Sequence, residues 1–359
     1  MLKLRLSVLL ILTLSSSACQ VPGMWDPDVL AGHPAATPID LPAEVYQGGI
    51  ALDPKGERLA YATPDGLFIK AVGGAPQKLS APGGSVTDLA WSPDSRFLIL
   101  SEREIEPHCV GNQCSSGLSE DVYRLQRVSV ADGSVTTLAE HVFGLHSIET
   151  APAGRWMAYQ EATRNLTLLD PEAGTMESVS GDRNVESFAW SPQGDAIAFR
   201  SRVDDANSRV STFCRVTLES KQVQELGAID GELVSGLFGP IWKSDGTAIR
   251  AFGTNNSLRL PVTEFSISDE QVHSYEVALQ NQTLRSFSAS PDGSRLVATN
   301  MKSFKEAEDL VSIALDAGTV THLAPPVAIY QWVGGGSRVL ATVGRSWPKK
   351  YYLLDLPKD

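Results

Sequence analysis

The stretch Ser290-Pro291-Asp292-Gly293-Ser294-Arg295-Leu296 is one copy of a motif that recurs along the chain. Close copies are Ala90-Trp91-Ser92-Pro93-Asp94 and Ala189-Trp190-Ser191-Pro192-Gln193-Gly194, and apolar stretches surround each of them. A unit that recurs in this way cannot bury its apolar face alone and must stack on its neighbours. The repeat therefore predicts the architecture of the protein more directly than its activity.

Aligning the chain on the proline of this motif gives seven copies. The aligned positions are Pro54, Pro93, Pro152, Pro192, Ser244, Pro291 and Gly334, at spacings of 39, 59, 40, 52, 47 and 43 residues. Units of roughly 40–50 residues suit four short strands, which is the size of one propeller blade. We therefore expect an all-β fold in which residues 46–359 form a single β-propeller of seven four-stranded blades, with six or eight blades as alternatives.

The residue types of the motif explain the predicted turn. Proline presets φ at the first central turn position, aspartate bonds its own backbone, and glycine accepts a positive φ. The run that follows, such as Arg96-Phe97-Leu98-Ile99-Leu100, is apolar on both faces, as a strand between two other sheets requires. Later in the unit, Asp132-Gly133 and similar pairs predict a hairpin between the third and fourth strands. Each unit is thus predicted to be a four-stranded meander.

The Trp-Ser-Pro-Asp-Gly-Ser-Arg-Leu type of unit resembles the WD-like repeat of TolB-like β-propellers. The resemblance covers nearly all of residues 46–359 and implies the propeller fold, but it leaves the function open. TolB has an α/β domain before its propeller, whereas only about 26 residues separate Cys19 from the first repeat unit. The expected blade count also differs, so the resemblance is to the repeat and implies no Tol–Pal role.

The last repeat unit is short by one strand. The segment 36–45, which contains Thr37-Pro38-Ile39-Asp40-Leu41, is predicted to supply the missing strand. Closing the ring in this way would remove an exposed sheet edge. The alternative is that these residues are only a linker.

Residues 1–18 have the pattern of a signal peptide. Lys3 and Arg5 precede an apolar stretch, and small residues lead into Cys19. This arrangement resembles a bacterial lipoprotein signal, which implies a lipid on Cys19 and a flexible tether over residues 19–45. Gln20 resembles the class that is sorted to the outer membrane. We expect an exported protein in the periplasm or at the cell surface, anchored through Cys19; ordinary signal-peptide cleavage is the alternative.

The cysteines agree with an oxidising compartment. Cys109 and Cys114 have four residues between them in the longest insertion, residues 101–121, and we predict a disulfide between them. A structural zinc site is the alternative, but it needs four ligands, and the two thiols and His108 supply only three. Cys214 lies in a predicted strand and is expected to be a small buried residue.

Composition argues against two classes of partner. The chain carries 42 acidic and 30 basic residues, a net charge of −12, which disfavours nucleic acid and an electrostatic attachment to anionic lipid. The sequence contains no catalytic elbow, zinc-protease motif, phosphate loop or dinucleotide fingerprint. We therefore assign no catalytic residue, cofactor or metal, and expect contact with the membrane only through the lipid.

The insertions of the second, fourth and fifth units are the candidate binding loops. They contain Glu102, Glu104, Glu106 and His108, then Asp204 and Asp205, then Asn255 and Asn256. If residues 102–108 are extended, the three glutamates and the histidine lie on one side and resemble a cation site; the alternative is a solvated acidic loop. All three insertions follow the second strand of their unit, so we expect them on one face of the ring.

Two functional hypotheses follow from these observations. The first is a binding or scaffold module for a protein, a peptide or another envelope component, with the insertions as the contact surface. The second is an enzyme at the channel mouth, a metal-assisted lyase or hydrolase that acts on a carbohydrate or a lactone. The sequence favours the first.

Overall fold

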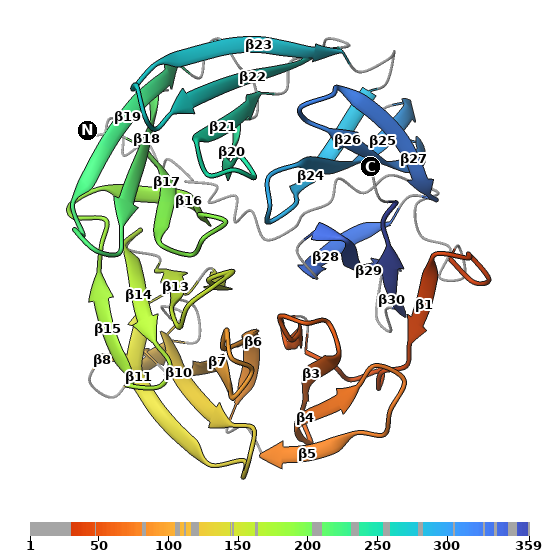
Figure 1. The fold of residues 1–359 in the computed structure, drawn as a ribbon. Helices are drawn as coiled ribbons and strands as arrows, with labels where there is room; N and C mark the ends of the chain where they lie inside the picture. Colours follow the sequence, from red (N-terminus) through yellow and green to blue (C-terminus); the bar gives the residue numbers. More distant parts are fainter. Residues whose placement is uncertain are drawn as a thin grey trace, which may run out of the picture.

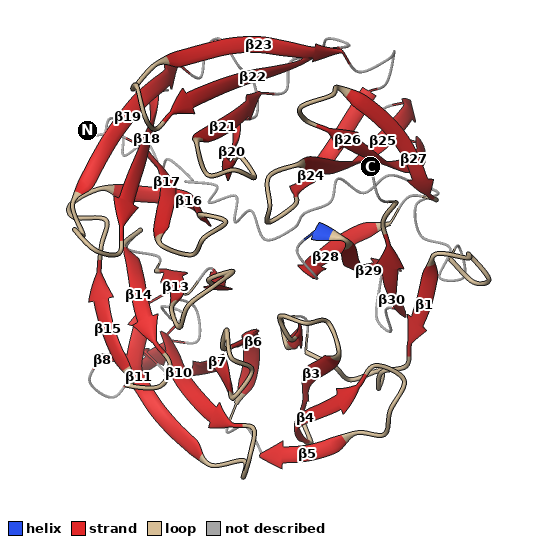
Figure 2. Ribbon diagram, in the orientation of Figure 1, coloured by secondary structure: helices blue, strands red, loops and turns tan. Residues whose placement is uncertain are grey.

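Seven antiparallel sheets form a closed ring in the computed structural model (Figure 1). The structure describes residues 30–46, 48–80, 84–104, 108–110, 113–115, 122–143, 145, 147–161, 164–202, 210–230, 237–253, 259–278, 283–303, 306–325, 327–333, 336–343 and 350–357. Strands make up most of this part of the chain (Figure 2). No helix in these ranges is long and apolar enough to cross a membrane.

The first three blades follow the predicted meander. Blade 1 contains β2 (Ile50–Leu52), β3 (Arg58–Thr63), β4 (Gly66–Ala71) and β5 (Gln77–Ser80). Blade 2 contains β6 (Ser85–Trp91), β7 (Phe97–Glu104), β10 (Val122–Ser129) and β11 (Val135–Phe143), with the hairpin β8 (His108–Val110) and β9 (Gln113–Ser115) inserted after β7. Blade 3 contains β12 (Ser147–Thr150), β13 (Met157–Gln160), β14 (Leu166–Asp170) and β15 (Thr175–Ser178).

The remaining blades have the same order. Blade 4 contains β16 (Asn184–Trp190), β17 (Ala196–Arg202), β18 (Val210–Thr217) and β19 (Val223–Asp230). Blade 5 contains β20 (Leu237–Trp242), β21 (Ala248–Gly253), β22 (Arg259–Ser266) and β23 (Val272–Ala278). Blade 6 contains β24 (Thr283–Ala289), β25 (Arg295–Ser303), β26 (Glu306–Ala314) and β27 (Thr319–Ala324). Blade 7 contains β28 (Ala328–Val333), β29 (Arg338–Val343), β30 (Lys350–Asp355) and β1 (Ala36–Ile39).

The N-terminal strand closes the ring, as predicted. Strand β1 pairs antiparallel with β30, from Ala36 opposite Leu354 to Ile39 opposite Tyr351. Ile39 is buried in a cluster that blades 7 and 1 share. Gln331 of β28 completes the junction, because its side chain bonds both the N–H and the carbonyl of Leu52, at 2.9 and 3.2 Å. Seven blades are thus held in one ring by the two ends of the propeller sequence.

The hydrophobic core lies between neighbouring blades. One cluster joins Leu98 and Leu100 of blade 2 to Ala60 and Leu67 of blade 1, and comparable clusters fill the other seams. Each second strand therefore packs on both faces, which explains its continuous apolar sequence. The repeat buries its core only when the blades stack, as the sequence pattern requires.

The serine of the motif stabilises the turn from within. Ser92, Ser191 and Ser290 are buried, and each Oγ accepts the backbone N–H of the residue five positions later, at 2.9 to 3.1 Å. Asp53 takes the same position in blade 1 and accepts the N–H of Arg58 at 3.0 Å. These bonds satisfy buried backbone groups at the end of the first strand. The motif is thus turn chemistry, as its sequence indicated.

The tryptophan of the motif links three of the blades, 2, 5 and 7, each to the blade before it. The indole N–H of Trp91 donates to the carbonyl of Ala51 at 3.0 Å, and that of Trp242 donates to the carbonyl of Ala189 at 3.0 Å. Trp332 makes the equivalent bond to the Ser288 hydroxyl at 2.7 Å. In each case the acceptor lies two residues before the serine position of the preceding blade. The tryptophans therefore link innermost strands across the seams.

The glycine of the motif permits close contact between successive turns. Gly293 has φ of +63°, and a Cβ there would lie 1.5 Å from the carbonyl oxygen of Trp242 in the preceding blade. Gly194 has φ of +69° and would place a Cβ 2.4 Å from the carbonyl oxygen of Ala153. Blade 2 has Ser95 at this position, with φ of +59°. The turns thus form a continuous rim at one end of the ring.

Candidate functional site at the axis of the ring

The innermost strands β2, β6, β12, β16, β20, β24 and β28 surround the axis of the ring (Figure 1). Blades converge there, so small residues dominate, and the position two before the motif serine is Ala51, Ala90 or Ala189 in blades 1, 2 and 4. Blade 3 has Glu149 at the same position. Blade 2 has Asp88 four residues before its motif serine, where blade 4 has Ser187. Two acids therefore replace small residues on adjoining innermost strands.

Asp88 connects the innermost strands of blades 2 and 3. Its Oδ2 accepts the N–H of Ile148 on β12 at 3.0 Å, and its Oδ1 accepts the N–H of Leu89 at 2.9 Å. A register shift between Val86 and Asp88 places the side chain, because β6 is irregular there against β7. Thr150 forms a second link, donating from its hydroxyl to the carbonyl of Trp91 at 2.5 Å. The acid is thus held rigidly at the seam.

The pKa of each of these two carboxyl groups is raised above its ordinary value. Burial raises the pKa of Asp88 to about 7. The two backbone N–H groups that bond its carboxylate lower the pKa, but the effect of burial is larger. The pKa of Glu149 is also raised to about 7, first by burial and then by the negative charge of Asp88. The Glu149 side chain is exposed, so solvent screens part of this effect. A raised pKa brings a carboxyl group towards the range required of a general acid or base at physiological pH.

The next seam departs from the tryptophan pattern. Trp190 is 5% exposed, and its indole N–H has no hydrogen-bond partner in the described part of the chain. By the register of the other tryptophans, its counterpart in the preceding blade is Glu149. A buried donor without a partner is costly. Other bonds still cross this seam, since the Gln160 side chain donates to the carbonyl of Val185 at 2.5 Å and the N–H of Val185 donates to the carbonyl of Arg164 at 2.8 Å. The acid pair and the unpartnered indole lie on the same side of the axis.

The innermost strands of blades 5 and 6 carry two aromatic residues that meet. Phe238 of β20 and Phe287 of β24 contact each other, with ring centroids 5.3 Å apart. Phe238 is 37% exposed, one of four large hydrophobic side chains that are exposed among the described residues. The innermost strands thus present acids on blades 2 and 3 and aromatic rings on blades 5 and 6.

The described part of the chain contains no group of three or more histidine, cysteine, aspartate or glutamate side chains that could hold a metal ion. At the axis, two carboxylates are the potential ligands that the structure places together.

The predicted insertion residues have separate locations. Glu102 lies on β7 and is buried, with its carboxylate 4.0 Å from the guanidinium of Arg124 on β10, so it belongs to the body of blade 2. Glu104 ends β7 and His108 begins β8. The other predicted site residues lie outside the described residues: Cys19, Glu106, Asp204, Asp205, Asn255 and Asn256.

The two cysteines of the insertion lie opposite each other. Cys109 on β8 and Cys114 on β9 are direct partners in an antiparallel pair, between His108–Ser115 and Val110–Gln113. Directly opposed residues have Cα atoms within the range that a disulfide needs. The register therefore agrees with the predicted bond, which stays a prediction. Cys214 is buried and free on β18, as expected.

The face predicted for the insertions follows from the topology. The second strands β7, β17 and β21 run in the same sense in their blades, so the connections after them leave at the end opposite the rim of turns. The connection in blade 5, 254–258, is no longer than 161–165 in blade 3, whereas blade 7 has a longer one at 344–349. Blade 2 carries the largest insertion. The comparison of unit lengths in the sequence did not identify the long connection of blade 7.

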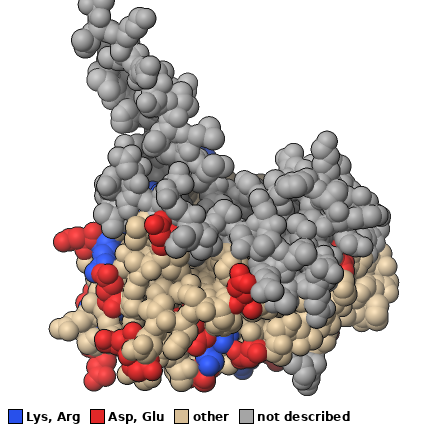
Figure 3. All heavy atoms as spheres, turned by 90° about the horizontal axis from the view of Figure 1, so that it is seen from above, with Lys and Arg blue, Asp and Glu red and all other residues tan. Residues whose placement is uncertain are grey.

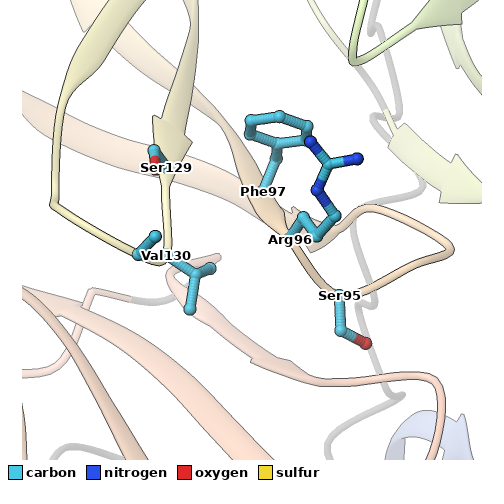
Figure 4. Close-up of a pocket in the computed structure, with 6 residues that line it drawn as sticks. Ser95, Arg96, Phe97, Ser129 and Val130 are labelled. Atoms are coloured by element: carbon cyan, nitrogen blue, oxygen red, sulfur yellow. The ribbon is translucent and has the colours of Figure 1, made fainter.

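A pocket of about 460 Å³ lies between the first turns of blades 1 and 2 and is lined by Asp53, Lys55, Glu57, Arg58, Pro93, Asp94 and Ser95. A second pocket, of about 270 Å³, is lined by Ser95, Arg96, Phe97, Ser129, Val130 and Ala131 on blade 2 (Figure 4). Arg96 lies beside the ring of Phe97 there, with its guanidinium carbon 5.3 Å from the ring centroid. This second pocket contains no carboxylate, histidine or thiol, so its lining offers no acid–base or nucleophilic group.

Sequence reasoning missed Asp88 and Glu149 because neither belongs to a recognised motif. The repeat contained the signal, since in the aligned copies only blades 2 and 3 have an acid at these two positions. A comparison of innermost-strand positions, rather than a search for insertions, would have found them.

No family profile and no curated protein matches the chain. The solved structures it resembles include an oligogalacturonate lyase from Vibrio parahaemolyticus, at 12% identity and a TM-score of 0.60, covering 90% of this chain and 97% of that one. Kuenenia stuttgartiensis hydrazine synthase gives 12% identity and a TM-score of 0.56, over 88% and 97% of the two chains. TolB from Acinetobacter baumannii gives 14% identity and a TM-score of 0.49, over 86% and 79%. At these identities the comparisons show the propeller fold alone.

Proposed function

We propose that this protein is an exported, lipid-anchored β-propeller that binds a protein or peptide of the cell envelope. The observation that carries the proposal is the shared exit of the strand connections in blades 2, 4 and 7 at one end of the ring. Long connections on a rigid scaffold are where propellers and other folds place their recognition residues. The blade 2 insertion supplies a further hairpin, β8–β9, to this face.

The location rests on the sequence. The signal-like N-terminus and Cys19 support export and lipid attachment, with the outer membrane as the expected site. The opposed Cys109 and Cys114 support an oxidising compartment. Acidic side chains are spread over the visible surface, with Lys and Arg in few places (Figure 3), which disfavours direct adsorption to anionic lipid headgroups.

The test is replacement of residues 105–121 by a short turn between β7 and β10, in a chain expressed in its own host. We expect the stability of the ring to be kept, because the β7–β10 pairing is independent of the hairpin. We also expect loss of the envelope partners that co-purify with the intact chain after reversible crosslinking. A matched control shortens 344–349 on the same face. Unchanged partners in both variants would contradict the insertion face as the binding surface.

An enzyme at the axis is the second candidate function. The observation that favours it is the pair Asp88 and Glu149 on adjoining innermost strands, each with a raised pKa. A metal-assisted lyase or hydrolase would need ligands beyond these two carboxylates. Element analysis of the purified chain, together with assays on a lactone and on an acidic oligosaccharide, tests this candidate. Turnover that is abolished in Glu149→Gln would favour it over the binding module.

A further inference from the structure

Every blade of the ring ends in an outer strand whose far edge has no neighbour within its sheet: β5, β11, β15, β19, β23, β27 and β1. Such an edge exposes unpaired backbone donors and acceptors, and proteins protect it by keeping the strand short, interrupting it with a bulge, or placing proline or lysine on it. The seven outer strands can be compared on these three criteria.

Six of the seven outer strands are protected. Strands β5, β15 and β1 have four residues each, and β1 contains Pro38. The pairings of β11, β19 and β27 with their inner neighbours are interrupted by register shifts. Interrupted and short edges present few backbone groups in line, so they are poor templates for another strand.

Strand β23 of blade 5 has none of these protections. Its seven residues pair with β22 without interruption, from Val272 opposite Phe265 to Ala278 opposite Arg259. Its sequence contains no proline, lysine or arginine. Val272 is 49% exposed and Tyr275 is 38% exposed, so two of the four exposed large hydrophobic residues in the described ranges lie on this one strand. It lies at the outer margin of the ring (Figure 1).

The hydrogen-bond register shows which backbone groups are available. The N–H of Ser266 donates to the carbonyl of Gln271 at 2.9 Å, so the pair formed by these residues bonds inward. Bonded and non-bonded pairs alternate in an antiparallel ladder, so His273, Tyr275 and Val277 also bond inward to β22. The N–H and C=O groups of residues 272 and 274 therefore project from the outer edge of the sheet.

The charge around β23 selects the kind of strand that fits. Asp269 and Glu270 precede the strand, Glu276 lies on it, and all three are exposed. Asp316 of blade 6 is 59% exposed. Asp316 and Glu264 both form ion pairs with the buried Arg250. The exposed charge is thus negative, which favours a basic segment and disfavours a second copy of this chain with its net charge of −12.

We propose that the outer edge of blade 5 accepts an additional β-strand from a basic, extended segment of a partner protein. The backbone groups of Val272 and Ser274 would bond the added strand, while Val272 and Tyr275 would contact its side chains. This surface is separate from the insertion face, so either one can fail without the other.

The probe is a synthetic peptide of about nine alternating lysine and valine residues, long enough to span β23. A second peptide carries N-methyl groups on alternate amides, which removes the backbone donors and leaves the side chains unchanged. We expect the first peptide to bind the full chain and to slow hydrogen exchange at the amides of residues 272 and 274. The methylated peptide is expected to bind at least about tenfold more weakly.

Ser274→Pro tests the edge in the protein itself. The substitution removes an N–H that projects outward and leaves the inward ladder intact, a position where an edge strand tolerates proline. We expect binding to weaken by about tenfold. Ser274→Thr keeps the N–H and is expected to bind as the unchanged chain does. Should Ser274→Pro fail to fold, Ser274→Lys replaces it, because a lysine on the edge repels the basic peptide.

Three results would overturn the proposal. The first is no binding of the unmethylated peptide. The second is equal binding to the unchanged chain, Ser274→Pro and Ser274→Lys. The third is a dimer of the full chain by light scattering that Ser274→Pro dissociates, since the occupant of the edge would then be a second copy.

Discussion

Asp88 on β6 accepts the backbone N–H of Ile148 on β12 at 3.0 Å, across the seam between blades 2 and 3. The bond satisfies a donor on an innermost strand, which has no fifth strand beyond it. It also places one carboxyl next to a second, because Glu149 follows Ile148 directly. A group that connects two blades therefore contributes to the proton chemistry of the axis as well.

Glu149→Gln is expected to change how stability depends on pH. The folded-state pKa of Glu149 is about 7, above its ordinary value of 4.5, so the folded chain holds this proton more tightly than the unfolded chain. That contribution is fully present below pH 4.5 and is lost as the pH rises towards 7. Because the side chain is exposed, we expect the effect to be below about 1 kcal/mol.

Urea unfolding from pH 4.5 to pH 8 measures this effect. The glutamine variant should lose less stability than the unchanged chain as the pH rises. Glu219→Gln, an exposed glutamate in the turn between β18 and β19, is the matched control and should leave the pH profile unchanged. Parallel profiles for all three proteins would contradict the coupling of Glu149 to Asp88.

Trp91→Phe and Trp190→Phe form a matched pair of variants. Both tryptophans are at least 95% buried at the same motif position, but Trp91 bonds Ala51 whereas the N–H of Trp190 has no partner among the described residues. Both variants lose similar packing, and only Trp91→Phe also leaves a carbonyl without its donor. We expect Trp91→Phe to cost about 1 kcal/mol more in the free energy of unfolding. Equal losses would argue that the indole bonds do not connect the blades.

Substitutions at the motif glycine position should have opposite signs in two blades. Gly293→Ala places a methyl group against the carbonyl of Trp242 and should destabilise the ring by roughly 3 kcal/mol or more. Ser95 has a positive φ, which a residue with a side chain adopts at a cost. Ser95→Gly removes this cost and should stabilise the ring by about 0.5 kcal/mol. Thermal unfolding followed by circular dichroism measures both. A stable Gly293→Ala variant would show that the turns do not pack as described.

Removal of β1 should open the ring. A chain that begins at residue 42 lacks the fourth strand of blade 7 and exposes β30, together with the cluster that contained Ile39. We expect a lower midpoint of thermal unfolding and concentration-dependent association through the exposed edge. A chain that begins at residue 30 keeps β1 and should unfold as the longer chain does. Identical midpoints for the two chains would contradict closure by β1.

The fold was largely predictable because the motif reports local turn chemistry and the repeat requires stacking. The position of Pro192, for example, indicates both the turn and the strand that follows it. The closing role of residues 36–39 was predictable from the missing strand of the last unit. Asp88 and Glu149 were not found, because their environment depends on two strands about 60 residues apart in sequence that meet at the axis.

The central claim is that the end of the ring carrying the insertions is the binding surface. A photo-crosslinking residue placed at Gln113 on β9 and, in a second variant, at Gln193 in the rim of turns tests it most directly, in cells of the native host. The account predicts a defined crosslinked partner from position 113 and none from position 193. The same crosslinked species from both positions, or one from position 193 alone, would contradict it.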